Sequence, residues 1–179
     1  KYDINLITCH LGNGCSITAI NGGRSVETSM GLTPLEGVPM GTRSGDLDPA
    51  ILFYLQDKGY TPAQLNTLCN KQSGLLGISG ISNDMRLLAD KAKQGSRYAQ
   101  LAIDVFIYRI KKYIGAYKAA ISGCDALVFT AGIGEHQEGI RKRICAGLFI
   151  YLKKKPKVLV IPTNEELMIA RQTYNLIKR

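Results

Sequence analysis

The sequence has 179 residues, of which 45% are hydrophobic and 21% are charged, so it is long enough for one domain with a buried core. No apolar run approaches the roughly 18 residues of a membrane helix, and the start KYDINLI is strand-like and does not have the pattern of a signal peptide, so we expect a cytoplasmic protein with no membrane partner. Because that start lacks an initiator Met, we also expect a fragment or a chain whose beginning was lost.

Positive charge is in excess, with a formal net charge of +9. The basic residues mostly lie along apparent helices, and the one dense run is KKKPK at 153–157. A solvated loop is the favoured interpretation of that run, and a nucleic-acid patch is the alternative. A general excess of positive charge also suits a protein that handles phosphates. Because only the net charge favours a nucleic-acid role, we expect no nucleic-acid partner.

The cysteines are five in number and scattered along the chain, at Cys9, Cys15, Cys69, Cys124 and Cys145. The count is odd and no C-x-x-C pair is present. We therefore expect neither a disulfide framework nor a structural zinc site, and a reducing compartment fits best.

The front of the chain predicts an antiparallel meander. Three short strands are expected at 4–9, 16–20 and 24–29. HLGNG (10–14) and the tight-turn signal NGG (21–23) separate them. About twenty residues rich in Gly, Pro and Thr follow at 30–49, and a loop of this length inside a compact domain is usually functional.

Helical patterns then alternate with strands. Helices are expected from Asp48 to Gly59 and at 61–72, 82–95, 96–123, 138–149 and 163–179; strands are expected at 125–130 and 157–162. SGLLGISG (73–80) and AGIGEH (131–136) are expected to be glycine-spaced loops. The order predicts an α/β layered domain.

Two glycine-rich segments could approach a ligand. HLGNGCS (10–16) could form an ordinary hairpin or wrap an anion. In VFTAGIGEH a strand is followed by Gly132, Gly134 and a helix, which is where nucleotides bind in α/β proteins, but a tight structural turn is as good an interpretation.

Charged residues near these segments have ordinary and functional interpretations. Arg43 could be a solvated charge or a phosphate clamp, with Asp46 fixing its side chain, while Asp48 caps the following helix. Asp84 could cap a helix, and Arg86 could pack on a purine or a phosphate.

Glu165 and Glu166 are expected in the first turn of the last helix. There they could complement the helix dipole, or one carboxylate could hold Mg²⁺. His10 and His136, the only histidines, are far apart in the sequence and make a poor metal site.

Five motifs together resemble the acetate kinase family. They occur in the order HLGNGCS, TSMGLTPLEGVPMGTRSGDLDP, SGISNDMR, FTAGIGE and IPTNEELMIAR, so that the resemblance runs from about Asn5 to Arg171. The segment 28–49 is specific to kinases of short-chain acids. This family belongs to the fold group of sugar kinases, actin and the heat-shock ATPase, whose members hold ATP between two similar domains.

The resemblance implies a ribonuclease H-like, actin-like ATPase fold for residues 1–179, as the C-terminal, nucleotide-binding domain of a two-domain kinase whose N-terminal domain is absent. The nucleotide contacts that it implies are His10, Leu11, Gly12, Asn13, Gly14, Asp84, Met85, Arg86, Gly132, Ile133, Gly134, Glu135 and His136. The family usually has Asn where this chain has His136, and its segment between Phe149 and Lys157 is usually longer.

For catalysis, the resemblance implies that Asn13 reaches the transferring phosphoryl group, that Arg43 stabilises the transition state and that Glu165 helps to place Mg²⁺. The whole enzyme would transfer a phosphoryl group between ATP and acetate, giving ADP and acetyl phosphate, and would form a homodimer. This chain alone would bind nucleotide without turnover. The alternatives are a propionate or butyrate kinase and a non-catalytic nucleotide-binding module.

Overall fold

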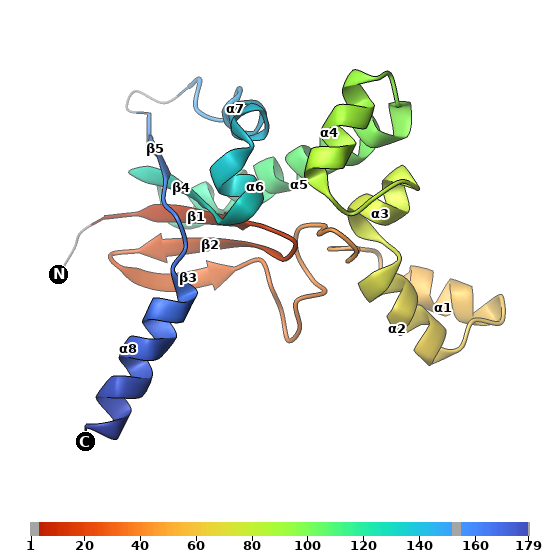
Figure 1. The fold of residues 1–179 in the computed structure, drawn as a ribbon, viewed down its shortest axis with the longest axis horizontal. Helices are drawn as coiled ribbons and strands as arrows, with labels where there is room; N and C mark the ends of the chain where they lie inside the picture. Colours follow the sequence, from red (N-terminus) through yellow and green to blue (C-terminus); the bar gives the residue numbers. More distant parts are fainter. Residues whose placement is uncertain (1–3, 152–154, 179) are drawn as a thin grey trace.

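A mixed five-stranded sheet organises the computed structural model, which describes residues 4–151 and 155–178 (Figure 1). Its strands are β1 (Leu6–Leu11), β2 (Cys15–Asn21), β3 (Arg24–Thr28), β4 (Ala126–Thr130) and β5 (Lys157–Val160), in the spatial order β3-β2-β1-β4-β5. Both neighbouring pairs among β1–β3 are antiparallel, whereas β4 runs parallel to β1 and to β5. The predicted meander and layered α/β class are confirmed.

The core lies between this sheet and the long helix α5 (Arg97–Ala120). β1 and β2 bury every second side chain, as strands with one covered face do. These side chains are Ile7, Cys9, Leu11, Cys15, Ile17 and Ala19, and they share one hydrophobic cluster with Phe106, Ile110 and Ile114 of α5. β4 is buried continuously from Ala126 to Phe129, which is typical of a strand with parallel neighbours on both sides.

The other helices are α1 (Ala50–Asp57), α2 (Pro62–Lys71), α3 (Gly74–Ser79), α4 (Met85–Lys93), α6 (Ala131–His136), α7 (Glu138–Cys145) and α8 (Glu165–Ile177). In Figure 1, α1–α4 gather beyond one end of the sheet, and α8 projects away from the sheet after β5. The expected helices at 61–72, 82–95 and 163–179 are confirmed within a few residues of their ends. The segment 30–49 contains neither helix nor strand, also as predicted.

Two predicted loops are short helices. The prediction of a loop at 73–80 was wrong because the amides of Leu75 and Leu76 donate to the carbonyls of Met40 and Gly41, both at 2.9 Å, and so satisfy the start of α3. The segment 131–136 forms α6, which begins directly after β4. The first turn is also shorter than predicted, because β1 continues through His10 and Leu11 and leaves only residues 12–14 between the strands.

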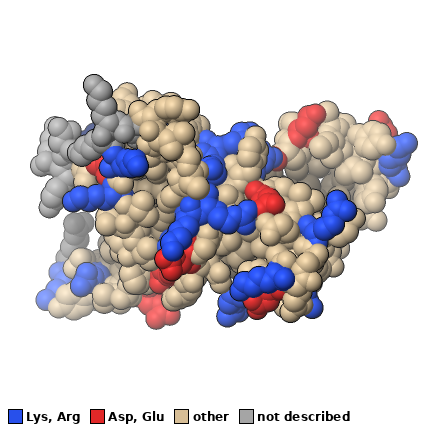
Figure 2. Space-filling view, turned by 90° about the horizontal axis from the view of Figure 1, so that it is seen from above, with Lys and Arg blue, Asp and Glu red and all other residues tan. Residues whose placement is uncertain are grey.

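The surface carries charge of both signs. Figure 2 shows Lys and Arg in several separate groups, with Asp and Glu between some of them. Of the basic run at 153–157, residues 153 and 154 lie outside the described residues. In the described part of the chain, no helix combines the length and the apolar character needed to cross a bilayer.

Candidate functional site

The turn between β1 and β2 is held by its own backbone and by a neighbouring thiol. The amide of Gly12 donates to the carbonyl of Gly14 at 3.0 Å, and the Cys15 thiol donates to the carbonyl of Gly12 at 3.3 Å. Burial raises the pKa of Cys15 to about 12, so the thiol stays a neutral donor and is no nucleophile. Asn13 is exposed, and its side chain makes no hydrogen bond within the described residues, so its amide is free to bind a ligand.

The start of α6 lies beside this turn. His10 is opposite Thr130 in the parallel β1–β4 ladder, so both strands end at the same edge of the sheet, and a Cβ added to Gly12 would lie 3.5 Å from the Cβ of Ala131. Ala131 has a φ of 64°, in the left-handed region that favours glycine. Such backbone costs on the order of 1 kcal/mol and clusters at functional sites. Here it turns the chain from β4 into α6.

A cavity of about 380 Å³ opens between the β1–β2 turn, the start of α4 and α6. Its lining residues are Gly12, Asn13, Asn83, Asp84, Met85, Arg86, Gly132, Ile133, His136 and Gln137. Three predicted nucleotide-binding segments, far apart in the sequence, therefore meet in one cavity. The lining combines small backbone-exposing residues with a few polar groups, which suits a small-molecule site.

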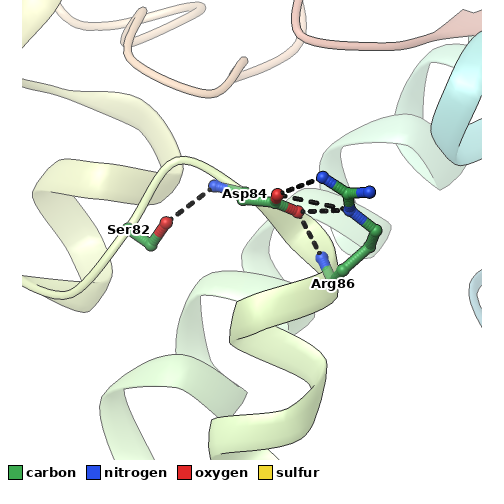
Figure 3. A network of polar contacts seen from close by, with 3 residues as sticks. All are labelled: Ser82, Asp84 and Arg86. Carbon is green, nitrogen blue, oxygen red and sulfur yellow. Dashed lines mark hydrogen bonds and ion pairs between the residues drawn. The ribbon is translucent and has the colours of Figure 1, made fainter.

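Asp84 performs the predicted capping role and also holds Arg86. Its carboxylate accepts from the Arg86 amide at 2.8 Å and from the Arg86 guanidinium through Nε and Nη2, while its own amide donates to the Ser82 hydroxyl at 3.0 Å (Figure 3). The Arg86 guanidinium and amide together lower the pKa of Asp84 to about 2. Asp84 is therefore a carboxylate at neutral pH, and Arg86 is held at the rim of the cavity.

A second hollow, of about 470 Å³, shares Gly132 and His136 with the first and reaches the start of α8. It is lined by His10, Ala131, Gly132, Glu135, His136, Thr163, Asn164, Glu165 and Glu166. Glu135 accepts from the Thr163 amide at 3.2 Å, which ties α6 to the segment before α8. Asn164 caps α8 by accepting from the Leu167 amide at 3.2 Å.

The carboxylates of this second hollow match the ligands that Mg²⁺ prefers. Among the described residues, no group of three or more His, Cys, Asp or Glu side chains is arranged to hold a metal by itself. Mg²⁺ usually takes one or two carboxylates together with substrate phosphates and water. Glu165, Glu166 and Glu135 supply carboxylates beside the cavity, so these residues could hold such an ion together with a phosphate chain.

Arg43 lines a third hollow, of about 700 Å³, which shares Asn13 with the first. The other lining residues are Gly14, Thr33, Leu35, Met40, Thr42, Asn66, Asn70 and Lys71. Two cations and three amides line it without a carboxylate, which favours an anion. The Arg43 guanidinium forms no ion pair in the described part of the chain, and its one hydrogen bond goes to the Met40 sulfur at 3.6 Å.

The expectation that Asp46 fixes the Arg43 side chain was wrong. Asp46 instead accepts from the Gly37 amide at 2.9 Å and from the Tyr113 hydroxyl at 2.8 Å. The competing partner lies on α5, 67 residues further along, where local sequence gave no sign of it. Asp48 lies just before the N-cap residue of α1, which is Pro49, and its carboxylate accepts from the Ala50 amide at 3.0 Å.

The structure therefore distributes the predicted site residues over three adjoining hollows. Leu11 is buried in the core, and Gly134 lies on the buried side of α6 against the sheet, where an added Cβ would lie 3.6 Å from the carbonyl oxygen of Cys9. Sequence reasoning missed Asn83, Gln137 and Lys71 as lining residues. Asn83 and Gln137 adjoin motifs that were recognised, whereas only the packing of α2 brings Lys71 to Arg43.

A mixed sheet with a glycine-rich turn after β1, a glycine-containing helix directly after β4 and a long helix over one face is the architecture of ribonuclease H-like, actin-like ATPase domains, as the sequence resemblance implied. Within that class the chain belongs to the acetokinase family, whose model matches residues 1–152.

Individual relatives agree with this assignment. The acetate kinase of Heliobacterium modesticaldum is 54% identical over 98% of this chain and 49% of its own length. The crystal structure of Porphyromonas gingivalis acetate kinase superposes with a TM-score of 0.93 at 41% identity, over 98% of this chain and 50% of that one. The crystal structure of a propionate kinase from Francisella tularensis superposes with a TM-score of 0.89 at 45% identity, over 95% of this chain and 49% of that one. The chain thus spans about half the length of these relatives.

Proposed function

We propose that this chain is the nucleotide-binding, C-terminal half of a two-domain acetate kinase, which transfers a phosphoryl group reversibly between ATP and acetate in the cytoplasm. The observation that carries the proposal is the meeting of residues 12–14, 83–86 and 132–137 around one cavity, with hollows on either side that contain carboxylates and cations. The chain's match to only half the length of its relatives supports a second, acid-binding domain.

The arrangement suggests how the residues divide the work. The first cavity takes the adenosine and the first phosphates, beside Gly132 and Ile133 at the start of α6. Glu165 supports Mg²⁺, which neutralises phosphate charge when bound. Asn13 lies on the boundary with the third hollow and orients the transferring phosphoryl group, and Arg43 neutralises charge on its equatorial oxygens.

A propionate or butyrate kinase is the second candidate. The Francisella tularensis propionate kinase resembles this chain nearly as closely in fold as an acetate kinase does. Acid chain length would be chosen by the other domain, so rates on acetate, propionate and butyrate with the two-domain enzyme decide between them. Homodimer formation is part of the proposal and is tested by the mass of the enzyme in solution.

The primary test is a calorimetric titration of the 179-residue chain with Mg·ADP, after circular dichroism has shown it to be folded. We expect saturable binding, and no acetyl phosphate from ATP and acetate until the other domain is present. A folded chain that does not bind Mg·ADP would overturn the nucleotide-binding role. Turnover by this chain alone would contradict the division of labour, and binding without turnover by the two-domain enzyme would favour a non-catalytic module.

A further inference from the structure

Arg43 lies in a loop that is closed at its neck. The Asp46 carboxylate accepts from the Gly37 amide at 2.9 Å, and the Asp46 amide donates back to the Gly37 carbonyl at 2.8 Å. This reciprocal pair joins the two ends of segment 37–46. The closure is tight, because a Cβ added to Gly45 would lie 2.5 Å from the carbonyl oxygen of Gly37.

The neck is fastened to the core helix α5 by two side chains one turn apart. The Tyr113 hydroxyl donates to the second Asp46 carboxylate oxygen at 2.8 Å, and the Arg109 guanidinium donates to the Asp46 carbonyl at 2.7 Å. Positions i and i+4 share a helix face, so both donors reach the loop from the same side. Asp46 thus makes four hydrogen bonds, and none of them goes to Arg43.

The far end of the loop is fastened separately. The Met40 amide donates to the carbonyl of Arg43 at 3.1 Å, and the Ser73 amide donates to the carbonyl of Thr42 at 2.9 Å. The backbone on both sides of Arg43 is therefore fixed while its guanidinium faces the third hollow without a carboxylate partner. Electrostatic preorganisation requires a charge that is held near the place where transition-state charge develops, and the fixed backbone limits where the Arg43 guanidinium can lie.

From this geometry we propose that Asp46 is a positioning residue for Arg43, and that Tyr113 and Arg109 of α5 set the place of the transition-state cation through it. The inference rests on the proposed function, because it gives Arg43 a role in phosphoryl transfer. Burial, together with the hydrogen bond to Asp46, raises the pKa of Tyr113, so its hydroxyl remains a donor across the working pH range.

The test compares Tyr113→Phe with Tyr117→Phe in the two-domain enzyme. Tyr117 is a buried tyrosine one turn further along α5, and its hydroxyl makes no hydrogen bond in the described structure, so the second variant is a matched control. We expect Tyr113→Phe to lower kcat about tenfold, with KM for Mg·ATP and acetate nearly unchanged, because Arg43 acts mainly in the transition state. The control should change neither.

A double-mutant cycle separates positioning from general loosening. In an Arg43→Ala background, Tyr113→Phe should lower kcat by less than about twofold, since the group that it positions is gone. An undiminished tenfold effect there, or equal effects of the two tyrosine variants, would overturn the proposal. Asp46→Asn retains the shape of the side chain but cannot accept from both Gly37 and Tyr113. This variant should therefore lower kcat by more than Tyr113→Phe does.

Hydrogen exchange on the 179-residue chain gives a readout that needs no activity. Amides within residues 37–46 should exchange about tenfold faster in Tyr113→Phe than in Tyr117→Phe. Equal exchange would overturn the fastening whatever the enzyme does. If the unsubstituted two-domain enzyme makes no acetyl phosphate, the proposed function fails, and the exchange rates still decide whether α5 holds this loop.

Discussion

Gly74 lies against the backbone of the Arg43 loop so closely that an added Cβ would stand 2.2 Å from the carbonyl oxygen of Met40 and 2.6 Å from that of Arg43. Its φ of +59° lies in the left-handed region, where an L side chain is strained in any surroundings. We expect Gly74→Ala to lower the free energy of unfolding by about 3 kcal/mol, from backbone strain plus displacement of the loop. Urea unfolding measures this loss.

Gly80 provides the matched control at the other end of α3. Its φ is +63°, but nothing lies within 4 Å of an added Cβ. Gly80→Ala should therefore cost only the left-handed strain, about 1 kcal/mol. Equal losses for the two alanine variants would show that the contact of Gly74 with the loop contributes nothing.

The Asp84–Arg86 pair predicts a pH dependence at acid pH. The guanidinium and amide of Arg86 lower the pKa of Asp84 from 3.8 to about 2, so the folded state binds this proton less readily than the unfolded state. The stabilisation is therefore complete above about pH 4 and is lost as pH falls toward 2. The free energy of unfolding of the parent chain should exceed that of Asp84→Asn at pH 6, and the difference should shrink between pH 4 and 2.

A difference in the free energy of unfolding that stays constant between pH 4 and 2 would contradict the lowered pKa of Asp84.

The Asp84–Arg86 pair also affects binding, because a ligand anion that draws Arg86 away from Asp84 would return the pKa of this carboxyl toward its ordinary value. Nucleotide binding near pH 3 should then take up protons, which calorimetry in buffers of different ionisation enthalpy would detect.

Filling the first cavity should weaken nucleotide binding without unfolding the chain. Gly132 lines the cavity, and nothing lies within 4 Å of an added Cβ. Gly132→Val should raise the Kd for Mg·ADP at least tenfold and change the free energy of unfolding by less than about 1 kcal/mol. Gly139→Val is the control, because Gly139 is an open helical position in α7 that lines none of the three hollows. An unchanged Kd for Gly132→Val would place the nucleotide elsewhere.

The local sequence pattern predicts most of the helices and strands, but it does not predict the contacts that hold the Arg43 loop. Alternation in β1 and β2 and the caps of α2, α4 and α5 are readable from neighbouring residues. α3 was missed because its glycines disfavour a helix, which forms through hydrogen bonds to Met40 and Gly41. The partner of Asp46 was missed because it too depends on a contact between residues that are far apart in the sequence, since Tyr113 is near Asp46 only in the fold.

The two glutamates at the start of α8 make a final test of metal binding. Both line the second hollow, and the family resemblance assigns the Mg²⁺ role to Glu165. Mg²⁺ should tighten ADP binding by the parent chain, and Glu165→Gln should remove most of that gain because an amide attracts the ion less than a carboxylate does. Glu166→Gln removes the same charge one position along the helix and should retain at least half of the gain. Titrations with ADP in the presence of Mg²⁺ and of EDTA measure it. A larger loss in Glu166→Gln would transfer the role to that residue, and equal small losses would show that neither carboxylate holds the ion.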